Sequence, residues 1–223
     1  MKREVLESDL RRLYNANDCV KANCGGCVGC SECCQGMGES IVLDPLDVWR
    51  MSEELKEDFS AMMEQCLELH MVDGLILPNL KMAGEEERCV FLNKEGRCGI
   101  HPARPGICRL FPLGRIYENG SFQYFLQNME CPKENKTKIK VSKWLDTPNL
   151  KQYEAYVNQW HYFLEEIRQM LEEQQDEELT RDLNTYLLNT FYVESYPAGV
   201  DFYEEFSRRY EKMGKLINIL KKK

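Results

Sequence analysis

The last third of the chain alternates apolar and polar residues in steps of three and four. From residue 148 to 171 this spacing forms an apolar stripe, broad enough to pack against more than one neighbouring element. Its apolar members are Leu150, Tyr153, Tyr156, Val157, Trp160, Phe163, Leu164, Ile167, Met170 and Leu171. The pattern predicts one long helix here. Two more are predicted at 177–192 and 201–220, separated by Tyr196-Pro197-Ala198-Gly199.

The first half of the chain also contains segments with helical spacing. Residues 4–14 predict an amphipathic helix. Asp44-Pro45 is typical of a helix start, with Asp as the N-cap and Pro in the first turn. Residues 53–72 predict another helix, and Cys66 falls within its apolar pattern. We interpret Cys66 as a buried core residue, because free cysteine often packs as a small apolar side chain.

Short apolar runs predict a few strands between these helices. Ile41-Val42-Leu43 and Cys89-Val90-Phe91-Leu92 are two such runs, and Leu75-Ile76-Leu77 is a third that ends at Pro78. Asn119-Gly120 is the dipeptide favoured in tight hairpin turns, so the residues on either side of it predict a β-hairpin. The segment 96–112 is rich in Pro and Gly and predicts an ordered loop.

These elements predict a mainly α protein. We expect helices packed around an irregular cysteine-rich metal-binding core, with a few short strands and one β-hairpin. The organisation that follows is a cysteine-cluster metal-binding region over residues 1–132, a lysine-rich linker over 133–147 and a helical C-terminal region over 148–223. The C-terminal helices are expected to pack on the first region as one compact unit.

The charge of the chain argues against some classes of partner. It contains 37 acidic and 29 basic residues, for a formal net charge of −8. This balance disfavours a broad surface for nucleic acid or anionic lipid. The N-terminal residues lack the apolar stretch of a secretory signal, and no run approaches the roughly 18 apolar residues of a membrane span. We therefore expect a cytoplasmic protein.

The cysteines are the feature that ordinary folding does not explain. The chain has eleven, and five of them fall within residues 24–34 among three glycines. Glycine lets such a loop curl tightly, so that several thiols face one point. Thiolates in short Cys-x2-Cys spacings are typical ligands of zinc, copper(I) and iron–sulfur clusters. Clustered cysteines in a reducing compartment indicate metal binding rather than a disulfide framework.

Spacing alone leaves the metal open. Cys24-x2-Cys27-x2-Cys30-x3-Cys34 has the spacing of a bacterial ferredoxin run, although Gln35 replaces the proline that follows there. The later cysteines lack the second Cys-x2-Cys pair of a zinc ribbon. Successive side chains such as those of Cys33 and Cys34 tend to point apart, which suggests two metals, or one metal with an outer shell of thiols. Several arginines lie among the later cysteines and either offset thiolate charge or are simply solvated: Arg88, Arg97, Arg104, Arg109 and Arg115.

Five segments carry a resemblance to a known family. They are Cys27-x2-Cys30-x2-Cys33-Cys34, Cys89-Val90-Phe91-Leu92, Gly96-Arg97-Cys98-Gly99-Ile100, the run from Arg104-Pro105 through Cys108-Arg109 to Pro112, and Cys131. In this order they resemble the CxxCxxCC, or YkgJ-like, family of zinc- or iron-chelating proteins. The resemblance implies that eight cysteines are metal ligands: Cys27, Cys30, Cys33, Cys34, Cys89, Cys98, Cys108 and Cys131. Whether Cys24 or His101 joins them is open, and for His101 a hydrogen-bonded loop residue is the favoured interpretation.

Three functions fit these observations. The favoured one is a cytoplasmic iron–sulfur protein of the 4Fe-4S type with a redox or cofactor role and an unknown protein or redox partner. The first alternative is a structural zinc protein in which the metal holds the loops and the helices present a surface to a partner. The second is an enzyme similar to the flagellin lysine methylases, which carry a similar cysteine cluster. Against that enzyme, no strand is followed by a Gly-x-Gly nucleotide loop.

Overall fold

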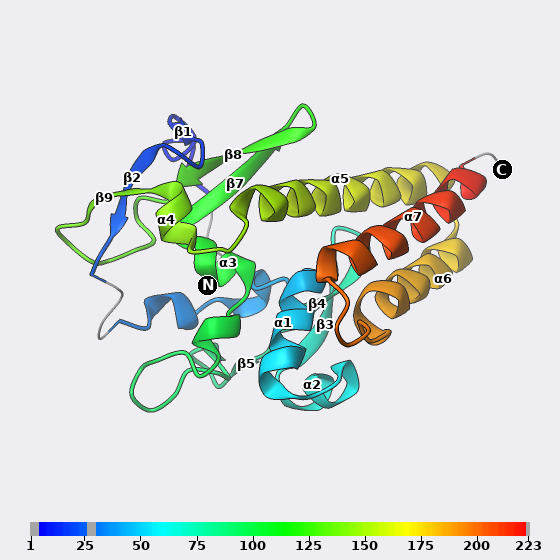
Figure 1. Ribbon diagram of the computed structural model, residues 1–223, viewed down its shortest axis with the longest axis horizontal. Coiled ribbons are helices and arrows are strands. Elements are labelled where there is room, and N and C mark those ends of the chain that lie inside the picture. The colour runs from blue at the N-terminus through cyan, green and yellow to red at the C-terminus, as the bar shows by residue number, and fades with distance from the viewer. Residues whose placement is uncertain (1–4, 26–29, 222–223) are drawn as a thin grey trace.

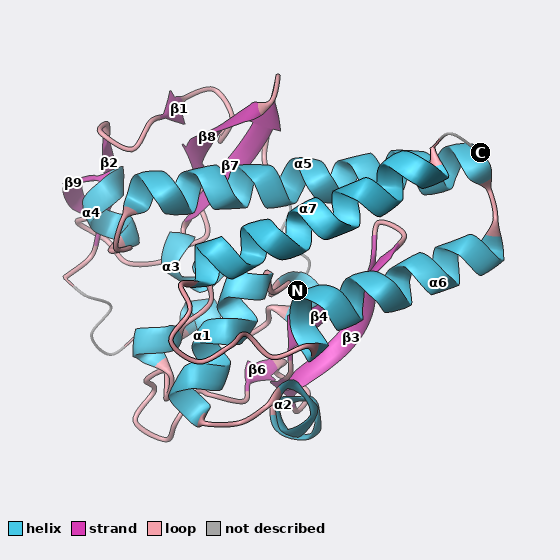
Figure 2. Cartoon of the chain, turned by 45° about the vertical axis from the view of Figure 1, so that its right-hand side comes forward, coloured by secondary structure: helices cyan, strands magenta, loops and turns pink. Residues whose placement is uncertain are grey.

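The computed structural model describes residues 5–25 and 30–221. Its longest element is α5 (Leu150–Gln174), which runs across the molecule between a strand-rich side and a mostly helical side (Figure 1). On the helical side, α7 (Phe202–Leu220) lies along α5, and α6 (Glu177–Leu188) continues into a π-helical turn at Asn189–Val193 (Figure 2). The long C-terminal helices predicted from periodicity are thereby confirmed.

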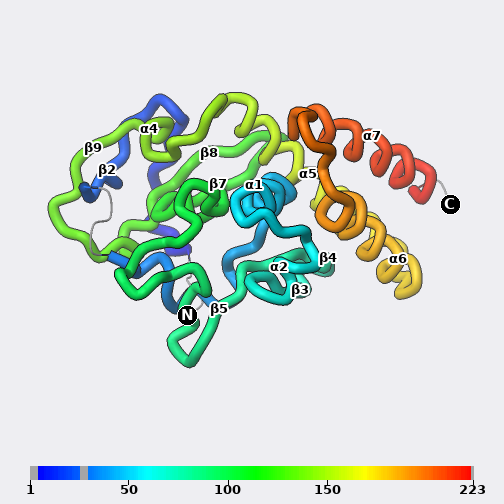
Figure 3. The backbone as a smooth tube through the Cα atoms, turned by 60° about the horizontal axis from the view of Figure 1, so that its bottom comes forward, coloured from blue at the N-terminus to red at the C-terminus, as the bar shows by residue number. Residues whose placement is uncertain are grey.

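The shorter helices lie toward the N-terminal end of α5 (Figure 1). They are α1 (Pro45–Leu55), α2 (Phe59–Gln65), α3 (Gly106–Leu110) and α4 (Val141–Leu145), with single 3-10 turns η1 (Glu32–Cys34), η2 (Gly38–Ser40) and η3 (His101–Ala103). Helix α1 begins as predicted, because Asp44 and Asp47 form a reciprocal capping box and Pro45 occupies the first turn. Figure 3 shows α1 and α2 between α4 on one side and helices α6 and α7 on the other.

The strands form four small antiparallel sheets in the described part of the chain. Strand β8 (Ser121–Leu126) lies between β7 (Leu113–Glu118) and β1 (Leu13–Tyr14). The pairs are β2 (Cys19–Asn23) with β9 (Thr137–Lys140), β3 (Leu67–Val72) with β4 (Leu75–Leu80), and β5 (Met82–Ala83) with β6 (Arg88–Cys89). The hairpin predicted at Asn119-Gly120 is confirmed as β7–β8, and both turn residues have the positive φ that its tight turn requires.

Of the helices predicted in the first half, the one at 4–14 is wrong and the one at 53–72 is only partly helical. The described part of 4–14 has no helix: Val5 and Leu6 are exposed, and Leu13–Tyr14 instead pairs with β8, where Tyr14 becomes buried. Within 53–72, Lys56 adopts a left-handed conformation that ends α1, and Asp58 caps the short helix α2. Residues Leu67–Val72 form strand β3, which pairs with β4 along its whole length.

The prediction of a mainly α protein built around a cysteine-rich core is also wrong. The structure is 46% helix and 20% strand, with several small sheets. Its larger core is aliphatic and aromatic, with Trp160, Phe163, Phe191 and Phe206 in mutual contact between α5, the π-helical turn and α7. The apolar faces of the helices bury one another, since burial of such large side chains is the dominant favourable term in folding. Most cysteines therefore lie beside this core, where loops meet.

The region predicted as a linker contains β9 and α4, and β9 pairs with β2. Through the whole described chain, no helix combines the length and the apolar character that crossing a bilayer requires.

Candidate metal centre

Cysteines from separate parts of the chain line one pocket of about 250 Å³. Its wall is formed by Cys24 and residues 30–34, by the loops around η3 and α3, and by the segment that follows β8. The cysteines in this wall are Cys24, Cys30, Cys33, Cys34, Cys89, Cys98, Cys108 and Cys131. Cys89 is buried and the others are half-buried. We call this space the cysteine pocket.

Seven of the eight predicted ligands thus border one space, while Cys27 lies outside the described residues. Their role as ligands stays a prediction. Cys24, which the family pattern does not include, borders the pocket as well. The sequence feature that points to Cys24 as part of this site is the recurrence of the first cysteines at every third residue, which begins at Cys24. Cys66 is 2% exposed and packs in the hydrophobic core, which confirms the sequence-based interpretation.

The 3-10 turn η1 presents Cys33 and Cys34 together. Its backbone closes through the bond from the Cys34 N–H to the Ser31 carbonyl, at 2.8 Å. Neighbouring side chains point apart in a strand, but this tight turn leaves the Sγ atoms of Cys33 and Cys34 only 3.9 Å apart. The N–H of Gly36 donates to the carbonyls of Glu86 and Glu87, so the turn is tied to the β5–β6 connection.

A compact loop positions Cys98 opposite Leu92. The side-chain oxygen of Asn93 accepts bonds from the N–H groups of Glu95 and Arg97, at 3.1 and 2.8 Å, and so closes the loop. The Gly99 N–H donates to the Phe91 carbonyl at 2.7 Å. A Cβ on Gly99 would lie 3.3 Å from that same oxygen, so glycine permits the close approach.

Helix α3 carries Cys108 and is attached to α1. The Asp47 carboxylate, on the first turn of α1, accepts a bond from the Gly106 N–H at 2.7 Å. A Cβ on Gly106 would collide with the Tyr153 hydroxyl of α5, so only glycine fits at this contact. These contacts join α3 to both α1 and α5. Asp47 does not border the pocket, but it holds α3, the helix that carries Cys108, in position. The sequence indicated a helix start at Asp44-Pro45 and gave no sign of this contact with α3.

The thiols of the pocket interact strongly with one another. The hydrogen bond between Cys34 and Cys33 is the largest cause that raises the pKa of Cys34, followed by burial and by the charges of Cys33, Cys89 and Cys108. Burial raises the pKa of Cys108 well above its usual value, and the charges of Cys33 and Cys89 add to this. Burial likewise raises the pKa of Cys89 and Cys98. A bound metal cation would reverse this preference, because it stabilises the thiolate form.

Basic side chains share the wall with the cysteines. The basic residues that border the pocket are Arg97, Arg104, Arg109 and Lys133. Arg88 and Arg115 do not border it and form hydrogen bonds elsewhere. Arg88 donates to the carbonyls of Leu92 and Asn93, and Arg115 donates to the Tyr153 hydroxyl. The cations in the wall would offset part of the negative charge that several thiolates carry.

His101 also borders the pocket, and its Nε2 lies 2.9 Å from an amino nitrogen of Arg104. Arginine has only donors, so this imidazole nitrogen accepts. Burial and then the positive charge of Arg104 lower the pKa of His101. The predicted hydrogen bond of His101 is thus present, with His101 at the start of the 3-10 turn η3, and its part in metal binding stays a prediction.

The donor set fits a soft metal or an iron–sulfur cluster, since thiols are the ligands that both take from proteins. The thiols surround the pocket rather than meet at one point. Across residues 5–25 and 30–221, no three His, Cys, Asp or Glu side chains stand close enough together to hold a single ion.

The family model CxxCxxCC, described as a putative zinc- or iron-chelating domain, matches residues 26–145. That span includes every cysteine of the pocket except Cys24. No curated protein and no solved structure matches the chain.

Proposed function

Because the chain belongs to the CxxCxxCC family of zinc- or iron-chelating domains, we propose that its cysteine pocket holds an iron–sulfur cluster of the 4Fe-4S type. The ligands would be drawn from Cys27, Cys30, Cys33, Cys34, Cys89, Cys98, Cys108 and Cys131. When bound, such a cluster supplies one-electron transfer at a potential set by its surroundings. The chain contributes thiolates and basic side chains in a partly buried wall.

The observation that carries this proposal is the number of thiols around a single space. A tetrahedral zinc site uses four ligands, each about 2.3 Å from the ion. Here eight described thiols surround a pocket of about 250 Å³ without converging on one point. A group with several metal atoms suits this arrangement better than one ion, and thiols beyond its ligands would form an outer shell.

An iron–sulfur role also has consequences for the cellular compartment of the protein and for its partner. A cytoplasmic, reducing compartment would keep these thiols available for metal. A redox role would require a protein or redox partner that approaches the pocket, and the acidic chain is not expected to recruit nucleic acid.

One distance favours structural zinc as the second candidate. Two sulfurs bound to one zinc ion in a tetrahedron are about 3.8 Å apart, given bonds of about 2.3 Å. The Sγ atoms of Cys33 and Cys34 are 3.9 Å apart. In that case the metal would hold the loops in place, and the function would lie in a surface that the protein presents to a partner.

Anaerobic purification separates the two candidates. An absorption spectrum would be measured with iron, zinc and acid-labile sulfide on the same sample. A brown protein whose iron is matched by sulfide is the expected result. A colourless protein with stoichiometric zinc and no sulfide would rule out the redox proposal and leave the zinc scaffold.

The ligand assignment is tested by a pair of cysteine variants. Cys108→Ser removes a thiol from the pocket wall, so we expect metal affinity to fall more than about tenfold. Cys66→Ser is the matched control, because Cys66 lies in the hydrophobic core and should leave metal content unchanged. Loss of metal in Cys66→Ser, or full retention in Cys108→Ser, would refute the assignment.

A further inference from the structure

A second pocket adjoins the cysteine pocket and has a different chemistry. It has a volume of about 510 Å³ and lies between the η3–α3 segment and α4 with the turn that follows it. His101, Arg104 and Arg109 line one side, and Ser142, Lys143 and Asp146 line the other. Figure 1 shows α3 and α4 as neighbours near the start of α5. Its volume lies in the range of small-molecule sites.

The two pockets lie on either side of a common wall. His101, Arg104 and Arg109 border both of them. A ligand in the second pocket would therefore lie against the same short segment that carries Cys108. Lys143 borders only the second pocket, so it allows a test that leaves the cysteine wall intact.

The second pocket holds an excess of positive charge. Arg104, Arg109 and Lys143 contribute three cations, and Asp146 contributes the one carboxylate. Within the described chain, none of the three cations has a carboxylate within ion-pair distance. This is unusual in a chain of formal charge −8, in which acidic residues are plentiful. Unneutralised cations gathered in a concavity attract anions.

The two arginines are held in place and keep donors available. Arg109 donates to the carbonyls of Arg104, Pro102 and Asp146, which fixes its guanidinium while two of its five N–H groups remain for a ligand. Arg104 uses one amino group on His101, and its buried Nε has no partner in the described structure. A fixed guanidinium is suited to bidentate recognition of an oxyanion.

From these contacts we propose that the second pocket binds the phosphate group of a small molecule beside the metal centre. A phosphate monoester carries a charge of about −1.5 to −2 near neutral pH, which matches the surplus of two positive charges in the pocket. Arg104 and Arg109 would bind its oxygens, and Lys143 would approach from α4. The hydroxyl of Ser142 lies in the same wall and adds a neutral donor.

The test is calorimetric titration of the full metal-loaded chain with inorganic phosphate at low ionic strength. We expect saturable binding at one site per chain. Lys143→Gln removes one charged donor and should weaken that binding about tenfold. Lys138→Gln is the matched control, because Lys138 is an exposed lysine of β9 outside the pocket, and its affinity should stay within about twofold of the parent.

Three results would overturn the proposal. They are the absence of saturable phosphate binding, equal weakening by Lys138→Gln, and acetate bound as tightly as phosphate. Metal content measured on the same samples should be unchanged in Lys143→Gln. The proposal does not depend on which metal the protein holds, so the titration and the metal analysis of the cysteine pocket succeed or fail separately.

Discussion

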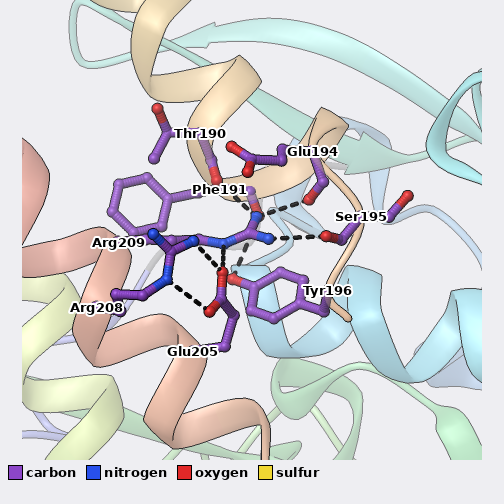
Figure 4. A network of polar contacts seen from close by, with 8 residues as sticks. All are labelled: Thr190, Phe191, Glu194, Ser195, Tyr196, Glu205, Arg208 and Arg209. Atoms are coloured by element: carbon purple, nitrogen blue, oxygen red, sulfur yellow. Dashed lines mark hydrogen bonds and ion pairs between the residues drawn. The ribbon is translucent and has the colours of Figure 1, made fainter. Parts of the chain in front are cut away.

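Arg209 shows how one buried charge organises its surroundings. It is 1% exposed, and its Nε donates to the Glu205 carboxylate at 2.8 Å (Figure 4). Its other nitrogens donate to the carbonyls of Thr190, Glu194 and Ser195. The guanidinium also lies over the ring of Tyr196, 4.0 Å from its centre. A single side chain thus fastens α7 to the π-helical turn and the loop after it.

The pH dependence of this network can be predicted. Hydrogen bonds from Arg208 and then Arg209 lower the pKa of Glu205 from 4.5 to about 2. The folded state therefore keeps this carboxylate ionised more readily than the unfolded state does. The stability that this provides is present above pH 4.5 and is lost as the pH falls through about 2. Its upper bound is about 3 kcal/mol, which is reduced by solvent screening at the exposed Arg208.

Glu205→Gln tests this prediction. Urea unfolding of the parent and the variant would be compared from neutral pH down to about pH 2. We expect the variant to be less stable at neutral pH, with a difference that shrinks as the pH approaches 2, because the parent carboxyl becomes neutral too. A difference that stays constant over this range would contradict the assignment.

At the scale of elements, the contact between α1 and α3 connects the hydrophobic core to the cysteine pocket. Helix α1 packs in the core through Leu46, Val48 and Met51. Asp47 on the same helix accepts the Gly106 N–H of α3, two residues before Cys108. A helix of five residues has little stability of its own, so its position depends on such contacts.

Asp47→Ala should therefore affect both stability and metal. It removes half of the capping box and leaves the buried Gly106 N–H without its acceptor, at a cost of about 2 to 3 kcal/mol. We expect a lower midpoint of thermal unfolding and reduced metal content after purification. Asp58→Ala is the control, because Asp58 also makes a helix-capping contact, as the N-cap of α2, but has no hydrogen bond to α3 in the described chain. It should cost about 1 kcal/mol and retain full metal content. Equal metal loss in both variants would argue against the α1–α3 connection.

At the scale of the molecule, the described chain has two differently built sides. Aromatic and aliphatic packing holds α5, α6 and α7 together. The loops around the cysteine pocket have fewer regular elements, and several short sheets hold their ends (Figure 2). A bound metal would add cross-links to the loop side alone, so we expect stability to be distributed unevenly.

Metal removal should expose this difference. After treatment with a chelator under reducing conditions, amide hydrogen exchange should rise in residues 30–34 and 89–112. Exchange in α5 and α7 should change little, because their protection comes from apolar packing. The measurement is hydrogen exchange read by mass spectrometry on metal-bound and metal-free samples. Uniform loss of protection, or none, would contradict the proposed division of stability.

Sequence was most informative where a local rule decides the structure. The three-and-four spacing in α5, the cap at Asp44-Pro45 and the turn at Asn119-Gly120 each depend on residues close together in the chain. These features could be predicted because backbone preference and side-chain spacing act over a few residues. The cysteine pattern spans more than a hundred residues and was identified by resemblance to a family; seven of its cysteines line a single pocket in the structure.

Tertiary structure decided everything that depends on distant partners. Leu67–Val72 has apolar positions compatible with a helix or a strand, and pairing with β4 selected the strand. Tyr14 is buried by its place beside β8, and Gly106 is required because the Tyr153 hydroxyl of α5 lies against it. The basic second pocket is equally nonlocal, since Lys143 lies far along the chain from Arg104. Local spacing specified the elements and the thiols, whereas packing between remote segments, which no local pattern encodes, determined which side chains share a space.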